Sequence, residues 1–210
     1  MRENANEPFV RNAWYIAAWP EELEDGVLAR TIMGEPLVIF RDADGKAAAL
    51  EDRCCHRGAP LSQGWIGDKG ITCGYHGLVF DGSGACVEIP GQDKIPAQTR
   101  VDAYPVVERQ KIIWIWMGDA GAADETKIVD YPYHDQPEKW PHKKATFTIG
   151  ANYMMMMDNL MDLSHLAYVH RKTIGGSPDA HAAAENSVTE TETGCVYERW
   201  MMNSPPPPTY

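Results

Sequence analysis

The stretch that most constrains the fold runs from Arg53 to Gly82, where cysteine and histidine occur together twice. The first half reads CCH and the second half reads CGYH, with sixteen residues between His56 and Cys73. Thiolates and imidazoles are the side chains by which proteins hold zinc, copper and iron–sulfur clusters. If one metal group takes ligands from both halves, the chain must fold back so that two loops lie side by side.

Two kinds of metal centre fit these ligand types. A structural zinc site could use one cysteine and one histidine from each half, although zinc fingers commonly present a cysteine pair followed by a histidine pair. The mixed halves fit better a [2Fe–2S] cluster in which two cysteines hold one iron and two histidines hold the other. Histidine ligation raises the reduction potential of such a cluster to roughly −150 to +300 mV.

Composition excludes several classes of function. Nineteen basic residues stand against thirty acidic ones, and no basic stripe is present, so we expect no nucleic-acid partner. The N-terminal segment lacks the features of a signal peptide and no window approaches a membrane span, so we expect a cytoplasmic protein that does not bind membranes. Five cysteines, an odd number, favour metal ligands in a reducing compartment over a disulfide framework.

Hydrophobic patterning predicts two units and a connector. Residues 1–119 contain short strands and tight turns, including three hairpins, which predict an all-β barrel or sandwich. Residues 120–144 are polar and contain prolines, as a connector does. Residues 145–210 combine a helix-forming segment with a further hairpin. The expected fold class is therefore α+β.

The second unit carries three more specific expectations. A strand is predicted within 143–153, followed by one buried helix from Tyr153 to His170. The methionines Met154–Met157 face all round such a helix, so most of them are expected in a core. A hairpin over 188–203 has alternating threonine and glutamate on its first arm, which predicts that one of its faces is exposed.

The segment DNLMDLSHLAYVH offers a second candidate site. Asp162 and His165 lie about 60° apart on an ideal helix, whereas His165 and His170 lie about 140° apart. The two histidines can meet on one metal only if the helix unwinds or bulges near 167–169. The alternative is two unrelated histidines near a helix end, where the helix dipole favours positive charge.

Taken together, the two segments resemble those of the Rieske non-haem iron aromatic oxygenases, in the vanillate O-demethylase and dicamba monooxygenase branch. CCHRG and CGYHG are similar to the Rieske signature C-x-H followed by C-x-x-H. The resemblance implies an N-terminal all-β Rieske [2Fe–2S] domain and the first part of a helix-grip-like α+β catalytic domain. It also implies that the cluster ligands are Cys54, His56, Cys73 and His76. Cys55 then stands where relatives usually have proline.

DNLMDLSHLAYVH is similar to the mononuclear iron motif of the same family, D/E-x-x-D-x-x-H-x-x-x-x-H. The resemblance implies that His165 and His170 bind iron(II) in a two-histidine, one-carboxylate site with positions open for O2. It implies that Asp162 links this iron to a Rieske histidine of a neighbouring subunit, and that Asn159 stands beside the site. The carboxylate ligand lies farther along the relatives' longer chains and is missing from this one.

The resemblance implies a terminal oxygenase that uses O2 to oxygenate a small aromatic substrate, methoxylated or carboxylated, for example by O-demethylation in aromatic catabolism. Electrons would come from NAD(P)H through a separate reductase with flavin and an iron–sulfur cluster, with or without a ferredoxin. The family assembly implies a homotrimer. Two alternatives stay open: a ring-dihydroxylating dioxygenase, or, if the chain is complete as shown, a Rieske electron-transfer protein. The substrate itself is not readable from the sequence.

Overall fold

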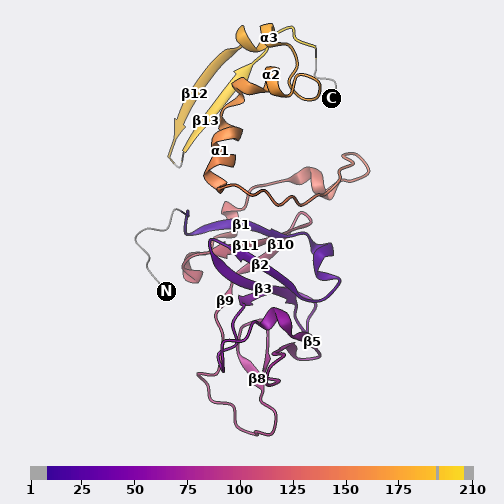
Figure 1. The fold of residues 1–210 in the computed structure, drawn as a ribbon, viewed down its shortest axis with the longest axis vertical. Helices are drawn as coiled ribbons and strands as arrows, with labels where there is room; N and C mark the ends of the chain where they lie inside the picture. The colour runs from indigo at the N-terminus through magenta and orange to yellow at the C-terminus, as the bar shows by residue number, and fades with distance from the viewer. Residues whose placement is uncertain (1–8, 193, 206–210) are drawn as a thin grey trace. The chain divides into compact units, whose positions relative to one another are not determined.

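The computed structural model describes residues 9–192 and 194–205 and has an α+β fold (Figure 1). It divides into two compact units, Met1–Lys143 and Lys144–Tyr210. The strands are β1 Ala13–Ala18, β2 Leu28–Ile32, β3 Glu35–Arg41, β4 Ala47–Glu51, β5 Trp65–Gly67, β6 Gly70–Thr72, β7 Val79–Phe80, β8 Cys86–Glu88, β9 Ala103–Tyr104, β10 Val106–Arg109, β11 Ile112–Met117, β12 Glu185–Thr191 and β13 Gly194–Trp200. The α-helices are α1 Tyr153–Met161, α2 Leu166–Val169 and α3 Pro178–Ala182. The 3-10 helices are η1 Pro20–Leu23, η2 Leu61–Gln63, η3 Ala120–Ala122, η4 Glu125–Lys127, η5 Pro132–Asp135 and η6 Leu163–His165.

The first unit is built around the antiparallel sheet β2-β3-β4-β9. Strand β3 carries four consecutive fully buried residues, Leu37 to Phe40. Because successive side chains of a strand point to opposite faces, such an apolar run requires a cover on both faces. Leu37 and Ile39 pack with residues of the β1-β11-β10 sheet, and Val38 and Phe40 pack with residues of the β5-β6-β7-β8 sheet. The unit therefore has three sheets and two main cores, one on each face of β3.

The predicted hairpins of this unit are confirmed, and two of them share one turn design. Between β3 and β4, the carboxylate of Asp42 accepts hydrogen bonds from two backbone N–H groups of the turn, and Gly45 has a φ of 77°. Between β7 and β8, Asp81 accepts equivalent bonds and Gly84 has a φ of 79°. Aspartate closes the turn, and glycine supplies the left-handed residue.

The segment from 120 to 143 contains no strand among its described residues and belongs to the first unit. The side chain of Ile128 in this segment is buried against Ile112 and Trp114 of β11. The indole of Trp14 in β1 donates to the carbonyl oxygen of Asp124 at 2.8 Å. This segment therefore packs against the β1-β11-β10 sheet rather than crossing solvent as a free linker.

The prediction of one continuous helix from Tyr153 to His170 is wrong. Helix α1 ends at Met161, and Asp162 follows in an extended conformation with φ −96° and ψ 93°. The carboxylate of Asp162 accepts a hydrogen bond from the backbone N–H of Ser164 at 2.9 Å, as an N-cap does. A short polar side chain that bonds its own backbone competes with helix continuation. The break therefore falls at Asp162, before the expected position near 167–169.

Two further expectations for the second unit are wrong. No strand forms in 143–153, and α1 has no buried residue, so Met154–Met157 do not form a core. Met155, for example, is 66% exposed. The predicted hairpin is confirmed as β12 paired with β13, but the described side chains of β12 are exposed on both faces. Among the described residues of this unit, none covers these surfaces.

In the described residues no helix has the length and apolar character needed to cross a membrane. The first eight residues of the N-terminal segment considered for a signal peptide lie outside the described range. Residues 206–210, in the proline-rich segment SPPPPTY, also lie outside it.

Replacing Phe40 by alanine should lower the free energy of unfolding of the first unit by about 3–5 kcal/mol, because a fully buried ring is lost from the core. The matched control is Phe147→Ala, at a phenylalanine that is 82% exposed, which should change stability by less than about 0.5 kcal/mol. Urea unfolding followed by tryptophan fluorescence measures both. Equal effects of the two variants would contradict the assignment of the core.

Candidate metal centres

The two cysteine–histidine loops are built as the same turn. In the first loop the N–H of Gly58 donates to the carbonyl oxygen of Cys54 at 2.9 Å, and in the second the N–H of Gly77 donates to that of Cys73 at 3.0 Å. Both glycines have left-handed φ values, 70° and 75°. The N–H of each cysteine is also bonded to the carbonyl oxygen five residues later, at 2.8 Å in both loops. The loops therefore have equal length, and only the place of the histidine differs, third in one and fourth in the other.

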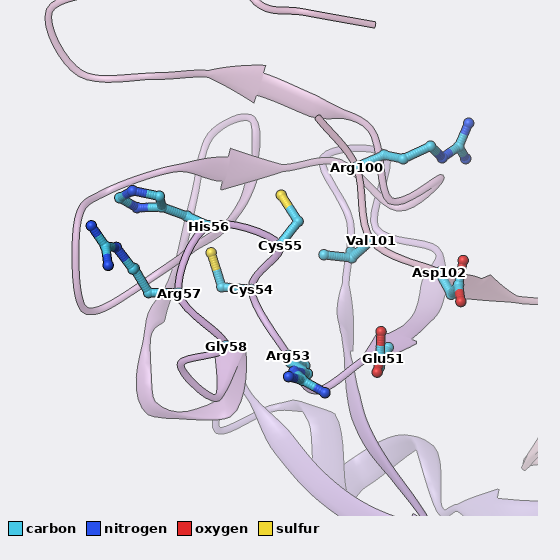
Figure 2. Close-up of a pocket in the computed structure, with 10 residues that line it drawn as sticks. All are labelled: Glu51, Arg53, Cys54, Cys55, His56, Arg57, Gly58, Arg100, Val101 and Asp102. Atoms are coloured by element: carbon cyan, nitrogen blue, oxygen red, sulfur yellow. The ribbon is translucent and has the colours of Figure 1, made fainter. Parts of the chain in front are cut away.

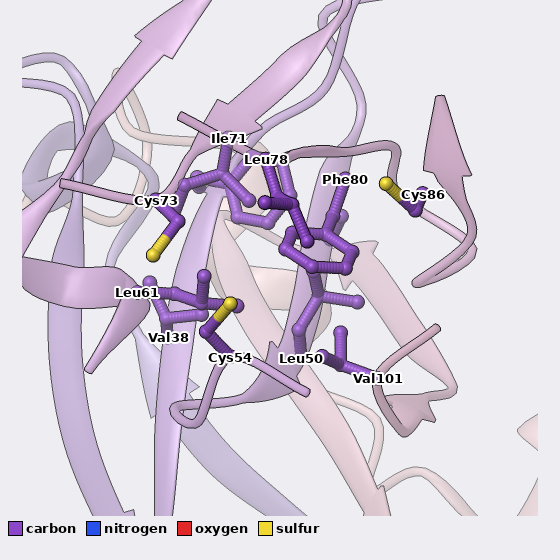
Figure 3. Packing of buried hydrophobic residues seen from close by; sticks show 12 residues of the cluster. Val38, Leu50, Cys54, Leu61, Ile71, Cys73, Leu78, Phe80, Cys86 and Val101 are labelled. Atoms are coloured by element: carbon purple, nitrogen blue, oxygen red, sulfur yellow. The ribbon is translucent and has the colours of Figure 1, made fainter. Parts of the chain in front are cut away.

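The turns bring the four predicted cluster ligands together, with sulfur inside and nitrogen outside. Cys54 and Cys73 are 2% and 1% exposed and belong to the core beneath the loops, where both thiols lie in the view of Figure 3. The rings of His56 and His76 are exposed, with centroids 4.5 Å apart. Two buried sulfurs and two outer imidazoles form the donor set of a Rieske cluster.

Burial controls the protonation of Cys54. The pKa of Cys54 is raised to about 11, chiefly by burial and further by a hydrogen bond with the Cys73 thiol. Cys54 is therefore a thiol at neutral pH before metal binds. Since metals bind the thiolate, cluster insertion must release the proton of Cys54.

The grouping of the ligands favours a two-iron cluster over zinc. A tetrahedral zinc ion gathers four ligands around one point, whereas each iron of a Rieske cluster takes two protein ligands. The separation of the two buried sulfurs from the two exposed imidazoles agrees with two irons.

Cys55 lies beside the pair but in a different environment. Its side chain is exposed, whereas that of Cys54 is buried. A surface pocket of about 490 Å³ is lined by Cys55 together with Cys54 and His56, with three arginines at its wall (Figure 2): Arg53, Arg57 and Arg100. The pKa of the Cys55 thiol is raised, mainly by partial burial. Its position favours Cys54 as the ligand of the CCH half.

Two glycines of this region pack against backbone carbonyl groups, and sequence reasoning did not single out one of them, Gly64. A Cβ atom on Gly64 would lie 1.9 Å from the carbonyl oxygen of Thr72, and one on Gly74 would lie 2.8 Å from that of Gln63. Neither distance is possible for a real side chain, so these positions require glycine for close packing of the second loop. The requirement for glycine at Gly64 is visible only in the folded structure, because Gly64 follows η2 whereas Thr72 lies in β6.

The second candidate site is brought together by the helix break. His165 ends η6 and His170 follows α2, and their ring centroids lie 5.4 Å apart. The Nδ1 atom of His165 lies 2.6 Å from the carbonyl oxygen of Asp162. When Nδ1 carries the proton and donates to that oxygen, Nε2 is left as the free ligand atom. The two imidazoles fit the histidine part of an iron site.

The acidic and amide residues of this segment are exposed. The pKa of Asp162 is lowered, first by hydrogen bonds from the Ser164 side chain and backbone, with smaller contributions from the charges of His165 and Arg199. Asp162 is therefore ionised at neutral pH. Asn159 lies on α1, one turn before it. No carboxylate among the described residues completes a group of three with the two histidines.

Comparison with known proteins identifies both halves. Residues 13–105 match the family model of the Rieske [2Fe-2S] domain, and residues 149–210 match that of the vanillate O-demethylase oxygenase C-terminal domain. The chain belongs to the Rieske non-haem iron oxygenases. It aligns with a crystal structure of dicamba monooxygenase bound to dicamba with a TM-score of 0.80 and 41% identity, covering 95% of this chain and 59% of that one.

Curated relatives place this Rieske oxygenase chain near three named systems. It is 46% identical to the iron–sulfur subunit of a toluene-4-sulfonate monooxygenase system from Comamonas testosteroni, over 93% of this chain and 56% of the relative. It is 48% identical to the dicamba O-demethylase oxygenase component of Stenotrophomonas maltophilia, over 78% and 48%. It is 40% identical to a vanillate O-demethylase oxygenase subunit of a Pseudomonas species, over 95% and 55%. The chain thus spans about half the length of these relatives.

Cys54→Ser should abolish the visible absorption of the cluster in anaerobically purified protein, because it removes a buried sulfur ligand. Cys55→Ser should largely spare that absorption, because its thiol is exposed. Absorbance, iron and acid-labile sulfide per chain measure both variants. Loss of the cluster in Cys55→Ser with retention in Cys54→Ser would transfer the ligand assignment to Cys55.

Proposed function

We propose that this chain belongs to the terminal oxygenase of a monooxygenase system acting on an aromatic substrate. The observation that carries the proposal is the convergence of His165 and His170, with ring centroids 5.4 Å apart, in a chain that also bears a Rieske domain. A Rieske centre alone supports electron transfer, and the second pair of imidazoles supplies a place for a different metal. Membership of a monooxygenase family agrees with this combination.

Each site has residues suited to its group. Cys54, Cys73, His56 and His76 would hold the [2Fe–2S] cluster, and His165 and His170 would hold iron(II) with a carboxylate that the described residues do not supply. When bound, the cluster supplies single electrons and the iron supplies O2 activation. The chain itself sets the geometry: the buried core beneath Cys54 and Cys73 keeps water from the sulfurs, and the exposed rings of His56 and His76 offer a contact surface.

Asp162 is the residue suited to meet that surface. Its carboxylate is exposed and ionised, and its backbone carbonyl accepts from the imidazole of His165. An approaching imidazole N–H of His56 or His76 from a second copy would find a hydrogen-bond acceptor directly beside the iron ligands. This arrangement supports a homotrimer in which each Asp162 serves a neighbour's cluster, with Asn159 beside the same site.

The names of the relatives support the substrate class. They act on toluene-4-sulfonate, dicamba and vanillate according to their names, and two are O-demethylases. We propose a small methoxylated or carboxylated aromatic substrate, oxygenated for example by O-demethylation in aromatic catabolism. In functional terms, residues 1–119 would carry the cluster, 120–144 would connect, and 145–210 would begin the catalytic domain.

The relatives named as oxygenase components also support a separate electron donor. We propose a reductase with flavin and an iron–sulfur cluster that takes electrons from NAD(P)H, with or without a ferredoxin. A dihydroxylating dioxygenase would place both atoms of labelled O2 in the product, whereas the monooxygenase proposed here would place one. A pure electron carrier would have no use for the converging pair His165 and His170.

Metal analysis of anaerobically purified chain tests the proposal directly. We expect about three irons to two acid-labile sulfides per chain, because a [2Fe–2S] cluster and a mononuclear iron would both be filled. A ratio of about two irons to two sulfides would contradict the mononuclear site in this chain and favour an electron carrier.

Asp162→Asn should stop substrate turnover while the cluster absorption and the metal content remain unchanged. Asparagine also caps helices, so the hydrogen bond to the Ser164 backbone is retained, and the loss would come from the missing charge. Asp158→Asn, at an exposed residue of α1, is the matched control and should keep activity. Product formation by the active enzyme measures both, and full activity in Asp162→Asn would rule out its bridging role.

A further inference from the structure

The turn that follows His170 closes directly on that residue's backbone. The carbonyl oxygen of His170 accepts hydrogen bonds from the N–H of Thr173 and the N–H of Gly175, both at 2.9 Å, and from the Thr173 hydroxyl at 3.2 Å. Three donors on one carbonyl fix the orientation of the peptide plane. They therefore limit where the His170 side chain can point.

Gly175 makes this closure sterically possible. A Cβ atom at Gly175 would lie 2.1 Å from the carbonyl oxygen of Leu166, 2.7 Å from the carbonyl carbon of His170 and 2.8 Å from the backbone nitrogen of Arg171. All three are backbone atoms, so no side-chain rotation relieves the clash. The Leu166 oxygen also accepts the N–H of His170 at 3.0 Å, which is the last hydrogen bond of α2. A methyl group at position 175 would clash with the carbonyl groups of Leu166 and His170, whose hydrogen bonds orient His170.

The requirement for glycine at this position comes from contact and not from φ. Gly175 lies outside the left-handed region, unlike Gly176, whose φ is 63°. A left-handed φ is therefore no obstacle to alanine at 175. Any effect of that substitution reports the close approach of the turn to α2.

The same turn belongs to the packed centre of the second unit. Among the described residues of that unit, the buried ones are Ala167, Gly175 and His181. Arg199 links strand β13 to α3, because its Nη2 donates a hydrogen bond to the carbonyl oxygen of His181 at 2.6 Å. The rest of α1 and the hairpin is largely exposed. Packing in this unit is thus concentrated around the histidine pair.

We propose that Gly175 is a positioning residue of the mononuclear iron site, which lets the 171–175 turn close on α2 and so holds His170 opposite His165. The proposal rests on the proposed function, because it assigns the histidine pair to iron. His165 is held separately, by the contact of its Nδ1 with the carbonyl oxygen of Asp162. The two rings are thereby oriented by backbone groups before metal binds.

The test compares Gly175→Ala with Gly150→Ala, a glycine of the same unit with no atom within 4 Å of an added Cβ and no left-handed φ. Anaerobic iron(II) titration of the cluster-loaded chain, followed by calorimetry, should show affinity about 10- to 100-fold weaker in Gly175→Ala, as for losses of groups that orient metal ligands. Gly150→Ala should match the parent chain. Cluster absorption should be the same in all three.

Hydrogen exchange of the metal-free proteins gives a readout that does not depend on iron. In Gly175→Ala the amides of residues 170–175 should lose protection, whereas Gly150→Ala should not change them. Thr173→Val, which removes the hydroxyl bond to His170, should shift both readouts in the same direction by a smaller amount, even if Gly175→Ala unfolds.

Unchanged exchange in Gly175→Ala, or lost protection with full iron affinity, would overturn the positioning role. Unchanged affinity and exchange in Thr173→Val, with Gly175→Ala unfolded throughout the unit, would also overturn it. If the parent chain binds no iron(II) beyond its cluster, the proposed function fails and the positioning role fails with it. Lost protection in the exchange data would then show that the closed turn itself is real.

Discussion

The burial of strand β3 on both faces is the constraint on which the first unit depends. Leu37 and Ile39 fill one core, and Val38 and Phe40 fill the other. Each of these side chains contributes roughly 1.5–3 kcal/mol when it leaves water. The second core also contains Cys54 and Cys73, so the sulfurs proposed as cluster ligands pack in the same core as the strand that organises the sheets. The position of the candidate cluster follows from this packing.

The sequence was sufficient where short-range chemistry decides the structure. Hairpins were predictable because aspartate and glycine occupy the turn positions that need them, as at Asp42 and Gly45. The approach of the two cysteine–histidine loops was predictable from residue types and spacing. The end of the helix after Tyr153 was not, because apolar density measures helix preference but not the competing hydrogen bond that the Asp162 carboxylate accepts from the Ser164 backbone N–H. Contacts such as that of Gly64 with Thr72 join residues whose proximity no local pattern reveals.

The unequal spacing of the two cysteine–histidine halves has a structural reason. Both loops run five residues from cysteine to a left-handed glycine, with the same pair of backbone hydrogen bonds. Identical turns facing each other with the histidine at the same place would present equivalent rings. Moving the histidine from third to fourth place offsets the rings, which then meet edge to face at 65°. Cys55 stands in the middle of the first turn, which the hydrogen bond from the Gly58 N–H to the Cys54 carbonyl oxygen closes.

The second unit distributes its packing unevenly, and this bears on how its site is formed. Exposed apolar side chains such as Met155 and Trp200 lie on α1 and β13, and exposed apolar surface of this kind marks interaction sites. The geometry of the pair His165 and His170 does not depend on contacts with those exposed surfaces. Its geometry comes from the break at Asp162, the bonds to the carbonyl oxygen of His170 and the close approach of Gly175. A histidine pair oriented by backbone contacts over so short a segment can keep its geometry independently of the exposed apolar surfaces around it.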